Sequence, residues 1–188
     1  MNSTNNRRLQ RIAYLSMSEW TSFMAAITSL RDRALFTVIY WRGLRASEPS
    51  LLTMGHLDFN RGMIRVERLK GSCGGEYMLS PAEKEELQAW LQVRGSEPGP
   101  LFPSRGGKPL KRGQIFLLFR RYATDAGVPE WKRRVHSLKH SIATHLLDKG
   151  VAITAVQDWL GHRNIANTMV YASVTNAQRT EAERIAYA

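Results

Sequence analysis

The 188-residue chain lacks several features that would assign it to a common class of protein. Its single cysteine, Cys73, excludes an internal disulfide framework and a zinc site built from cysteines. No apolar run is long enough to span a bilayer, and the N-terminus has no signal-peptide segment. The sequence also has no glycine-rich nucleotide-binding loop and no carboxylate cluster that would hold catalytic magnesium. These absences favour a cytoplasmic protein.

Positive charge is the strongest global signal. The formal net charge is +11, from 27 Lys and Arg against 16 Asp and Glu. A basic domain of this size is expected to bind a polyanion, and nucleic acid is the usual one. The basic residues are spread along the chain rather than gathered in one amphipathic tail, which argues against a membrane surface. We therefore expect a nucleic-acid-binding domain and no membrane partner.

The local patterns predict a mainly α fold (α+β) with a small three-stranded antiparallel sheet. A capping box at Ser16 and Glu19 predicts a first helix that continues to about Leu30. The segment 95–113, rich in Gly and Pro, is expected to be a surface connection. The other expected helices cover residues 31–40, 81–95, 114–127, 135–150, 153–160, 167–171 and the tail, and the expected strands lie within residues 57–69 and 76–80.

One predicted helix, VHSLKHSIATHLLDKG at residues 135–150, carries an unusual polar cluster. His136, Lys139 and His140 have the i, i+3, i+4 spacing that places side chains on one face of a helix. Such a cluster could bind a metal, move a proton or grip an anion. The anion site is favoured, because Lys139 would repel a metal cation. A different, largely apolar arc should face the core: Leu138, Ile142, His145 and Leu146.

Two further polar islands interrupt apolar surroundings, RGLRASE at 42–48 and WLGHRNIANTMVY at 159–171. Each functional candidate has a simpler structural interpretation, such as a surface ion pair for Arg45 or a core aromatic ring for Tyr171. Together, however, the candidates supply what in-line attack on a phosphodiester requires: cationic donors, a proton donor and a nucleophile. The candidate set is Arg45, Lys70, His136, Lys139, His162 and Tyr171.

The order and spacing of these motifs resemble those of the tyrosine recombinases, the phage-integrase-type site-specific recombinases. The matching pieces are GLRASE at 43–48, the turn lysine Lys70, HSLKHSIATHLL at 136–147 and LGHRNIANTMVY at 160–171. The resemblance implies an enzyme that cuts and rejoins DNA through a 3′-phosphotyrosyl link, without metal, ATP or another cofactor. Several motifs resemble the short members that invert a promoter segment to switch fimbriae on and off. Integration or excision of a DNA segment is an equal expectation.

The resemblance also implies roles for individual residues. Arg45 would grip the scissile phosphate, and Lys70 would protonate the leaving 5′ oxygen. His136 would assist as acid or base, and His162 would donate to a non-bridging oxygen. Tyr171 would be the nucleophile.

Three more residues of the motifs have supporting or altered roles. Lys139 stands where the family usually has arginine, and lysine lacks the planar fork that binds phosphate bidentately. Glu48 would orient Arg45 or its neighbours, and His140 would pack and position its helix. His145 is expected in the core.

The expected organisation is a short basic leader at 1–15, a catalytic domain at 16–174 and a tail helix at 175–188 that docks in trans or packs in cis. Either the chain is a fragment that lacks an N-terminal DNA-binding domain, or it is a naturally short member. The expected partners are double-stranded DNA and accessory DNA-bending proteins, in the cytoplasm at the nucleoid. We expect a monomer or weak dimer without DNA and a homotetramer on paired sites.

Two other functions remain open from the sequence. The first is a non-catalytic or weakly active DNA-binding regulator, suggested by Lys139. The second is a type IB topoisomerase, which uses the same chemistry to relax supercoils.

Overall fold

The computed structural model describes residues 12–69 and 72–172, and the predicted tail helix lies outside this range. The mainly helical architecture with a three-stranded antiparallel sheet is confirmed. In the described residues, no helix is long and apolar enough to cross a membrane. The helices are α1 (Met17–Ala25), α2 (Leu30–Arg42), α3 (Pro81–Arg94), α4 (Arg112–Asp125), α5 (His136–Asp148), α6 (Ile153–Trp159) and α7 (Ala166–Ala172). The strands are β1 (Leu57–Asp58), β2 (Met63–Val66) and β3 (Gly75–Met78), and the 3-10 turns are η1 (Glu48–Leu51), η2 (Met54–His56) and η3 (Glu130–Lys132).

The start of α1 agrees with the sequence, whereas its end does not. The predicted capping box forms, since the Ser16 hydroxyl accepts from Glu19 N–H and the Glu19 carboxylate accepts from Ser16 N–H. The helix ends at Ala25, well before the expected Leu30. The reason is a competing N-cap, because Ser29 is extended and its hydroxyl accepts from Asp32 N–H to begin α2.

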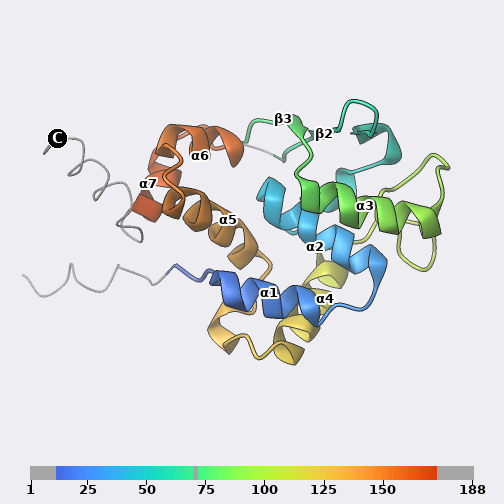
Figure 1. Cartoon of the computed structure of the whole chain (residues 1–188), viewed down its shortest axis with the longest axis horizontal. Coiled ribbons are helices and arrows are strands. Elements are labelled where there is room, and N and C mark those ends of the chain that lie inside the picture. The colour runs from blue at the N-terminus through green and yellow to red at the C-terminus, as the bar shows by residue number, and fades with distance from the viewer. Residues whose placement is uncertain (1–11, 70–71, 173–188) are drawn as a thin grey trace, which may run out of the picture.

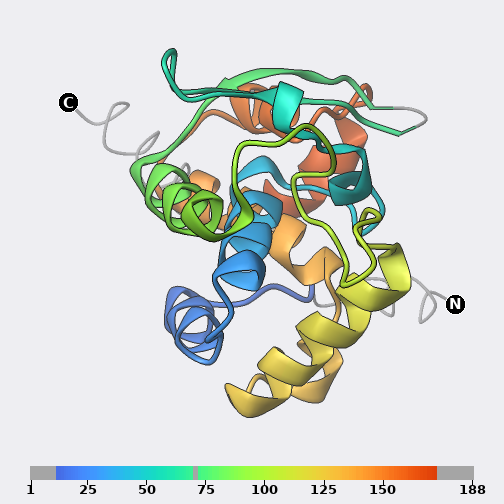
Figure 2. The same cartoon turned by 90° about the vertical axis from the view of Figure 1, so that its right-hand side faces the viewer.

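The sheet has the order β1-β2-β3, and the predicted hairpin between the first two strands is confirmed. Ile64 pairs with Tyr77 and Arg65 with Glu76 across the second ladder. Along β2 the side chains alternate, with Ile64 and Val66 buried and Arg65 exposed. Figure 2 shows the sheet on one side of the molecule and α4 on the opposite side, with α2 between them.

Helix α2 lies at the centre of the fold and contributes to two hydrophobic clusters (Figure 1). The larger cluster joins α2 to α1, α3, α4 and the sheet, through residues such as Phe23, Phe36 and Phe119. The smaller cluster joins Tyr40 of α2 to α5, α6 and α7. Helix α7 and the C-terminal half of α5 therefore pack in the smaller cluster, whereas Leu138 near the start of α5 packs in the larger one.

The expectation that residues 95–113 form only a surface connection was wrong. Leu101, Phe102 and Leu110 of this segment are buried in the larger cluster. The segment is held by backbone hydrogen bonding of Leu101 N–H to Leu52 and by the Trp90 indole, which donates to the Leu101 carbonyl. Buried backbone groups need hydrogen-bond partners, and these bonds anchor the segment against the core. The Gly- and Pro-rich composition did not show that its apolar side chains are buried.

Candidate active site

Arg45 is presented by the turn that ends α2. Gly43 closes the helix in the left-handed conformation, with φ of 54°, and a Cβ there would clash with Leu160 of α6. The buried carboxylate of Glu48 accepts hydrogen bonds from the Arg45 backbone N–H (2.8 Å) and guanidinium (3.1 Å). The guanidinium also donates to the Ser72 hydroxyl at 2.7 Å. Glu48 therefore contacts both the backbone and the guanidinium of Arg45.

Arg68 lies behind this unit and was not singled out from the sequence. Its side chain is fully buried, and its guanidinium pairs with Glu48 at 3.3 Å. It also donates to the carbonyls of Arg42 and Gly43 at the end of α2 and to that of Trp159 at the end of α6. Positive charge at two helix C-termini is favourable. The alternation of side chains along β2 could have identified Arg68 from the sequence. Position 68 continues the face of positions 64 and 66, which is buried.

The three residues of the predicted polar cluster on α5 differ in their exposure to solvent. His136 is exposed and His140 half-buried, and their rings meet edge to face with centroids 4.4 Å apart. Lys139, in contrast, is 1% exposed, and its ammonium donates to the Leu160 carbonyl at 3.0 Å. The prediction that all three side chains project as one cluster was therefore wrong for Lys139. The long side chain of Lys139 follows the inner edge of α5, where the C-terminal carbonyl of α6 attracts the amine.

The turn between α6 and α7 carries His162 and contacts the loop that follows β2. Gly161 has φ of 65°, and a Cβ there would clash with the Cys73 carbonyl oxygen. Cys73 N–H donates to the Gly161 carbonyl at 3.0 Å, and Ser72 forms an isolated antiparallel bridge with His162. His162 Nδ1 lies 3.0 Å from the hydroxyl of Thr168 on α7. This arrangement leaves Nε2 of His162 for a ligand.

Lys70 lies outside the described residues, but both sides of its loop are anchored at the site. Before it, Leu69 N–H donates to Glu48 at 3.4 Å. After it, Ser72 accepts from Arg45.

Tyr171 is both a core residue and a partner of the polar cluster. It is 2% exposed and belongs to the smaller hydrophobic cluster. Its hydroxyl lies 2.9 Å from Nδ1 of His140, which was expected to pack and position its helix. Burial raises the pKa of Tyr171, so the phenol holds its proton at neutral pH.

Burial and mutual repulsion also determine the charge of the basic groups. Burial, followed by nearby cationic groups, lowers the pKa of both His140 and His162 to about 4. Partial desolvation, together with Lys139 and Arg45, lowers the pKa of His136. Burial and the neighbouring arginines lower the pKa of Lys139 to about 7. At neutral pH the histidines are therefore neutral, and the fixed positive charge comes from the arginines.

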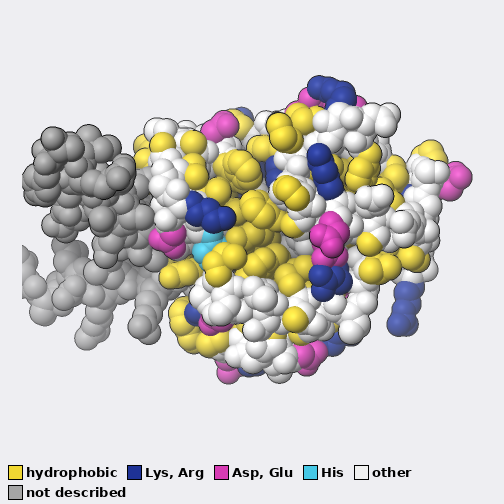
Figure 3. Space-filling view, in the orientation of Figure 1, with side chains coloured by type: hydrophobic (Ala, Val, Ile, Leu, Met, Phe, Trp, Pro, Cys, Tyr) yellow, Lys and Arg dark blue, Asp and Glu magenta, His cyan; other side chains and the backbone are white. Residues whose placement is uncertain are grey.

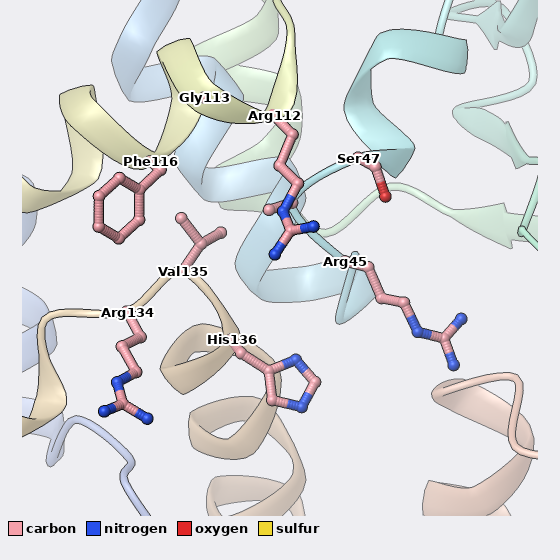
Figure 4. Close-up of a pocket in the computed structure, with 9 residues that line it drawn as sticks. Arg45, Ser47, Arg112, Gly113, Phe116, Arg134, Val135 and His136 are labelled. Carbon is pink, nitrogen blue, oxygen red and sulfur yellow. The ribbon is translucent and has the colours of Figure 1, made fainter.

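A cavity of about 690 Å³ opens beside Arg45 and His136. Arg112 at the start of α4 and Arg134 before α5 add positive charge to its lining, and Phe116 adds an apolar wall. Figure 4 shows Arg112 and His136 pointing into the space between them, whereas Arg134 points away. The cavity lining therefore combines cationic side chains with an apolar wall, which suits a polyanion with an apolar component. Figure 3 shows one face of the molecule, on which hydrophobic side chains form a broad patch with Lys, Arg, Asp and Glu side chains around it.

The structure thus joins most of the predicted residues into one site. Arg45 reaches Ser72, Ser72 pairs with His162, and His162 contacts α7, whose Tyr171 contacts His140 and so His136. His145 lies apart in the core, 6% exposed, as expected. Across the described residues, no group of three or more His, Cys, Asp or Glu side chains could hold a metal ion.

Comparison with known families agrees with this geometry. The model of the phage integrase family matches residues 13–178. The chain belongs to this family. The resemblance to tyrosine recombinases is therefore confirmed.

Curated relatives of this family member match over most of the chain. Tyrosine recombinase XerC of Pseudomonas aeruginosa is 40% identical over 146 residues, which are 75% of this chain and 46% of the relative. Type 1 fimbriae regulatory protein FimE of Escherichia coli is 33% identical over 175 residues, which are 88% of this chain and 87% of the relative. The chain thus spans about half the length of the XerC relative and most of the FimE relative.

Solved structures show the same fold. The crystal structure of XerA recombinase aligns with a TM-score of 0.78 and 25% identity over 90% of this chain and 61% of that one. XerH site-specific recombinase, bound to its difH substrate before cleavage, aligns with a TM-score of 0.73 and 26% identity over 85% of this chain and 50% of that one. The expected fold class is confirmed.

Proposed function

We propose that the chain, chiefly residues 16–174, is the catalytic part of a tyrosine-type site-specific recombinase. It would cut and rejoin double-stranded DNA through a 3′-phosphotyrosyl intermediate. The single observation that carries the proposal is the linked site, in which four separate segments bring Arg45, His136, His162 and Tyr171 together. The XerC relative is named a tyrosine recombinase, and one solved neighbour, XerH, is bound to its difH substrate.

The chemistry needs few components. The guanidinium of Arg45 and Nε2 of His162 bind the non-bridging oxygens of the scissile phosphate, where negative charge grows in the transition state. Tyr171 attacks phosphorus, the bond to the 5′ oxygen breaks, and Lys70 protonates that oxygen. His136 contacts the phosphate from the cavity side. The reverse attack by a 5′ hydroxyl rejoins the strand, so the reaction conserves the phosphodiester energy.

The surface around the site supports DNA as the substrate. Arg112 and Arg134 extend the positive lining of the cavity beyond the catalytic residues, and the whole chain carries a net charge of +11. We further propose a homotetramer on paired DNA sites and a monomer or weak dimer without DNA. In that assembly residues 175–188 dock on a neighbouring protomer, and accessory DNA-bending proteins align the sites.

Covalent trapping tests the proposal. The protein is incubated, with EDTA and without nucleotide, with labelled nicked duplexes that tile the DNA flanking its own gene. Denaturing gels then compare the wild type with Tyr171→Phe and with the control Tyr77→Phe, on the partly buried β3 tyrosine. We expect a slow-moving protein–DNA adduct in the wild type and Tyr77→Phe only. An adduct that persists in Tyr171→Phe would contradict the proposal.

One observation favours a second function, a DNA-binding regulator without strand cleavage. The amine of Lys139 bonds to the Leu160 carbonyl, so it is withdrawn from the position of a phosphate ligand. Tight, salt-dependent binding to the same duplexes without any adduct would favour this regulator over the recombinase.

A further inference from the structure

The nucleophile already has a proton acceptor at hydrogen-bond distance. The Tyr171 hydroxyl and His140 Nδ1 are 2.9 Å apart, and Tyr171 is 2% exposed, which limits access of water. The ring of His140 packs edge to face against His136, with centroids 4.4 Å apart, and His136 lines the cavity beside Arg45. The row of rings thus runs from the buried phenol to the position expected for the phosphate.

Attack by a phenol requires that its proton leaves as the bond to phosphorus forms. Other basic groups near Tyr171 are occupied or turned elsewhere. The amine of Lys139 is bonded to the Leu160 carbonyl, and Nδ1 of His162 faces the Thr168 hydroxyl. Among the described residues, His140 is the basic group that contacts the reacting oxygen.

We propose that His140 is a further catalytic residue, the general base that takes the proton of Tyr171 during cleavage and returns it during rejoining. The inference rests on the proposed recombinase function. As the bond between Tyr171 Oη and phosphorus forms, the phenol proton moves to Nδ1 of the neutral imidazole, whose Nε2 already carries its proton. The bond from phosphorus to the 5′ oxygen breaks, and that oxygen takes a proton from Lys70. Rejoining reverses each transfer.

The electrostatics of the site couple this base to DNA. Without DNA, burial and the neighbouring groups His136, Lys139 and His162 hold the pKa of His140 to about 4, so its lone pair is available but weakly basic. A phosphate anion at Arg45 would oppose the repulsion from these groups and raise the basicity of the imidazole. The base would then become effective when the substrate is bound.

The chain contains a matched control for this pair on the same helix. His145 Nδ1 lies 2.7 Å from the hydroxyl of Tyr40, both residues are buried, and neither lines the cavity. Loss of the His145 imidazole removes an equivalent hydrogen bond without touching the reacting oxygen. A purely structural role of His140 would make the two histidines equivalent in cleavage assays.

The test measures single-turnover adduct formation by His140→Ala and His145→Ala on nicked duplexes that the wild type attacks. Each duplex is made with an ordinary 5′ oxygen and with a 5′ bridging sulfur at the scissile phosphate. The thiol leaves without help, since its pKa is about 8.5. The sulfur duplex therefore restores the cleavage rate of a variant that lacks the general acid, but not that of a variant that lacks the general base. Affinity for the duplex and melting temperature are measured in parallel.

We expect His140→Ala to lose about a hundredfold in rate on both duplexes, with DNA affinity unchanged. Added imidazole should restore at least a tenth of the lost rate. Lys70→Ala should be slow only on the oxygen duplex, and His145→Ala should cleave like the wild type while melting earlier. If His140→Ala does not fold, His140→Gln, which keeps a polar side chain of similar length, should show the same loss on both duplexes.

A rate for the His140 variants that equals or exceeds that of the wild type would overturn the proposal, because the hydrogen bond would then only sequester the nucleophile. Rescue of these variants by the sulfur duplex, or a loss of rate that follows a loss of DNA affinity, would overturn it as well. The proposed function fails separately, if the wild type forms no adduct on any duplex.

Discussion

Histidines of helix α5 form two similar pairs with tyrosines, and the two pairs differ in their surroundings. In one, His140 Nδ1 lies 2.9 Å from the Tyr171 hydroxyl, and in the other His145 Nδ1 lies 2.7 Å from the Tyr40 hydroxyl. Both tyrosines are buried, and burial raises the pKa of each. The difference lies in what surrounds the pairs, and it shows that the pair alone does not distinguish the proposed nucleophile from a structural tyrosine.

The surroundings of the structural pair are aromatic. Tyr40 stacks on Trp20 with ring centroids 4.2 Å apart, and Tyr14 meets His145 edge to face. The surroundings of the proposed catalytic pair are basic, with His136 in ring contact and Lys139 and His162 close enough to lower the pKa of His140. An anion is therefore attracted to one end of α5 and not to the other.

The largest difference between the two pairs is expected when each tyrosine is replaced by phenylalanine. Tyr171→Phe should abolish adduct formation, because the nucleophilic oxygen is gone. Tyr40→Phe should form the adduct normally but lose about 1–3 kcal/mol of unfolding free energy, since the buried His145 nitrogen loses its partner. Trapping gels and urea unfolding measure the two properties. An adduct defect in Tyr40→Phe would mean that the pairs are not separate.

The next effect tests Arg68, which joins Glu48 to the C-terminal ends of α2 and α6. Arg68→Met should lower the unfolding free energy by about 3 kcal/mol, because it leaves helix-terminal carbonyls without a partner and removes one of the two arginines that pair with the buried Glu48. Arg61→Met is the control, since its ion pair with Glu76 is exposed and should contribute less than about 1 kcal/mol. Equal losses in urea unfolding would show that the buried arginine has no special role.

A smaller effect concerns the geometry of the phosphate ligand. Arg45→Lys keeps the charge but loses the fork that Glu48 and Ser72 orient. We expect adduct formation to slow about a hundredfold, with little change in melting temperature because the side chain is 36% exposed. The Tyr40 pair should be unaffected. A rate close to that of the wild type would remove Arg45 from the catalytic group.

The smallest expected effect is a dependence of DNA affinity on pH, caused by the titration of Lys139. The pKa of Lys139 is lowered to about 7, and a bound phosphate favours its charged form. DNA affinity should therefore be constant below pH 7 and decrease by up to about tenfold per unit above it. Lys139→Arg stays charged, so its affinity should not follow this decrease, and its cleavage should equal or exceed that of the wild type. Titrations of affinity between pH 6 and 9 distinguish the two.

A large loss of cleavage in Lys139→Arg would contradict this account. It would mean that the site is built around lysine, with its amine on the Leu160 carbonyl as an essential contact.

Local signals made most of the fold predictable. The caps at Ser16 and Ser80 and the turn at Gly43 act within a few residues, so they can be read from the sequence. The end of α1 could not be fixed, because the cap at Ser29 competes with the continuing helical pattern. The site was predictable as a set of residues, because their order follows the family motifs.

Contacts between distant segments were not predictable. Lys139 points to Leu160 and Arg68 reaches both α2 and α6, and these directions depend on how the helices pack. The bond between His140 and Tyr171 joins residues 31 positions apart, so neither motif shows it alone. The sequence therefore allowed the candidate residues to be proposed, but not the contacts that Lys139, Arg68 and His140 make with distant segments.

The most direct test of the account is to identify the protein atom that carries the DNA. The wild-type adduct would be digested with protease and nuclease, and the linked peptide sequenced by mass spectrometry. The account predicts a single nucleotide joined through its 3′ phosphate to Tyr171, with a free 5′ hydroxyl on the released strand. A linkage through the 5′ phosphate, or to any other residue, would contradict it.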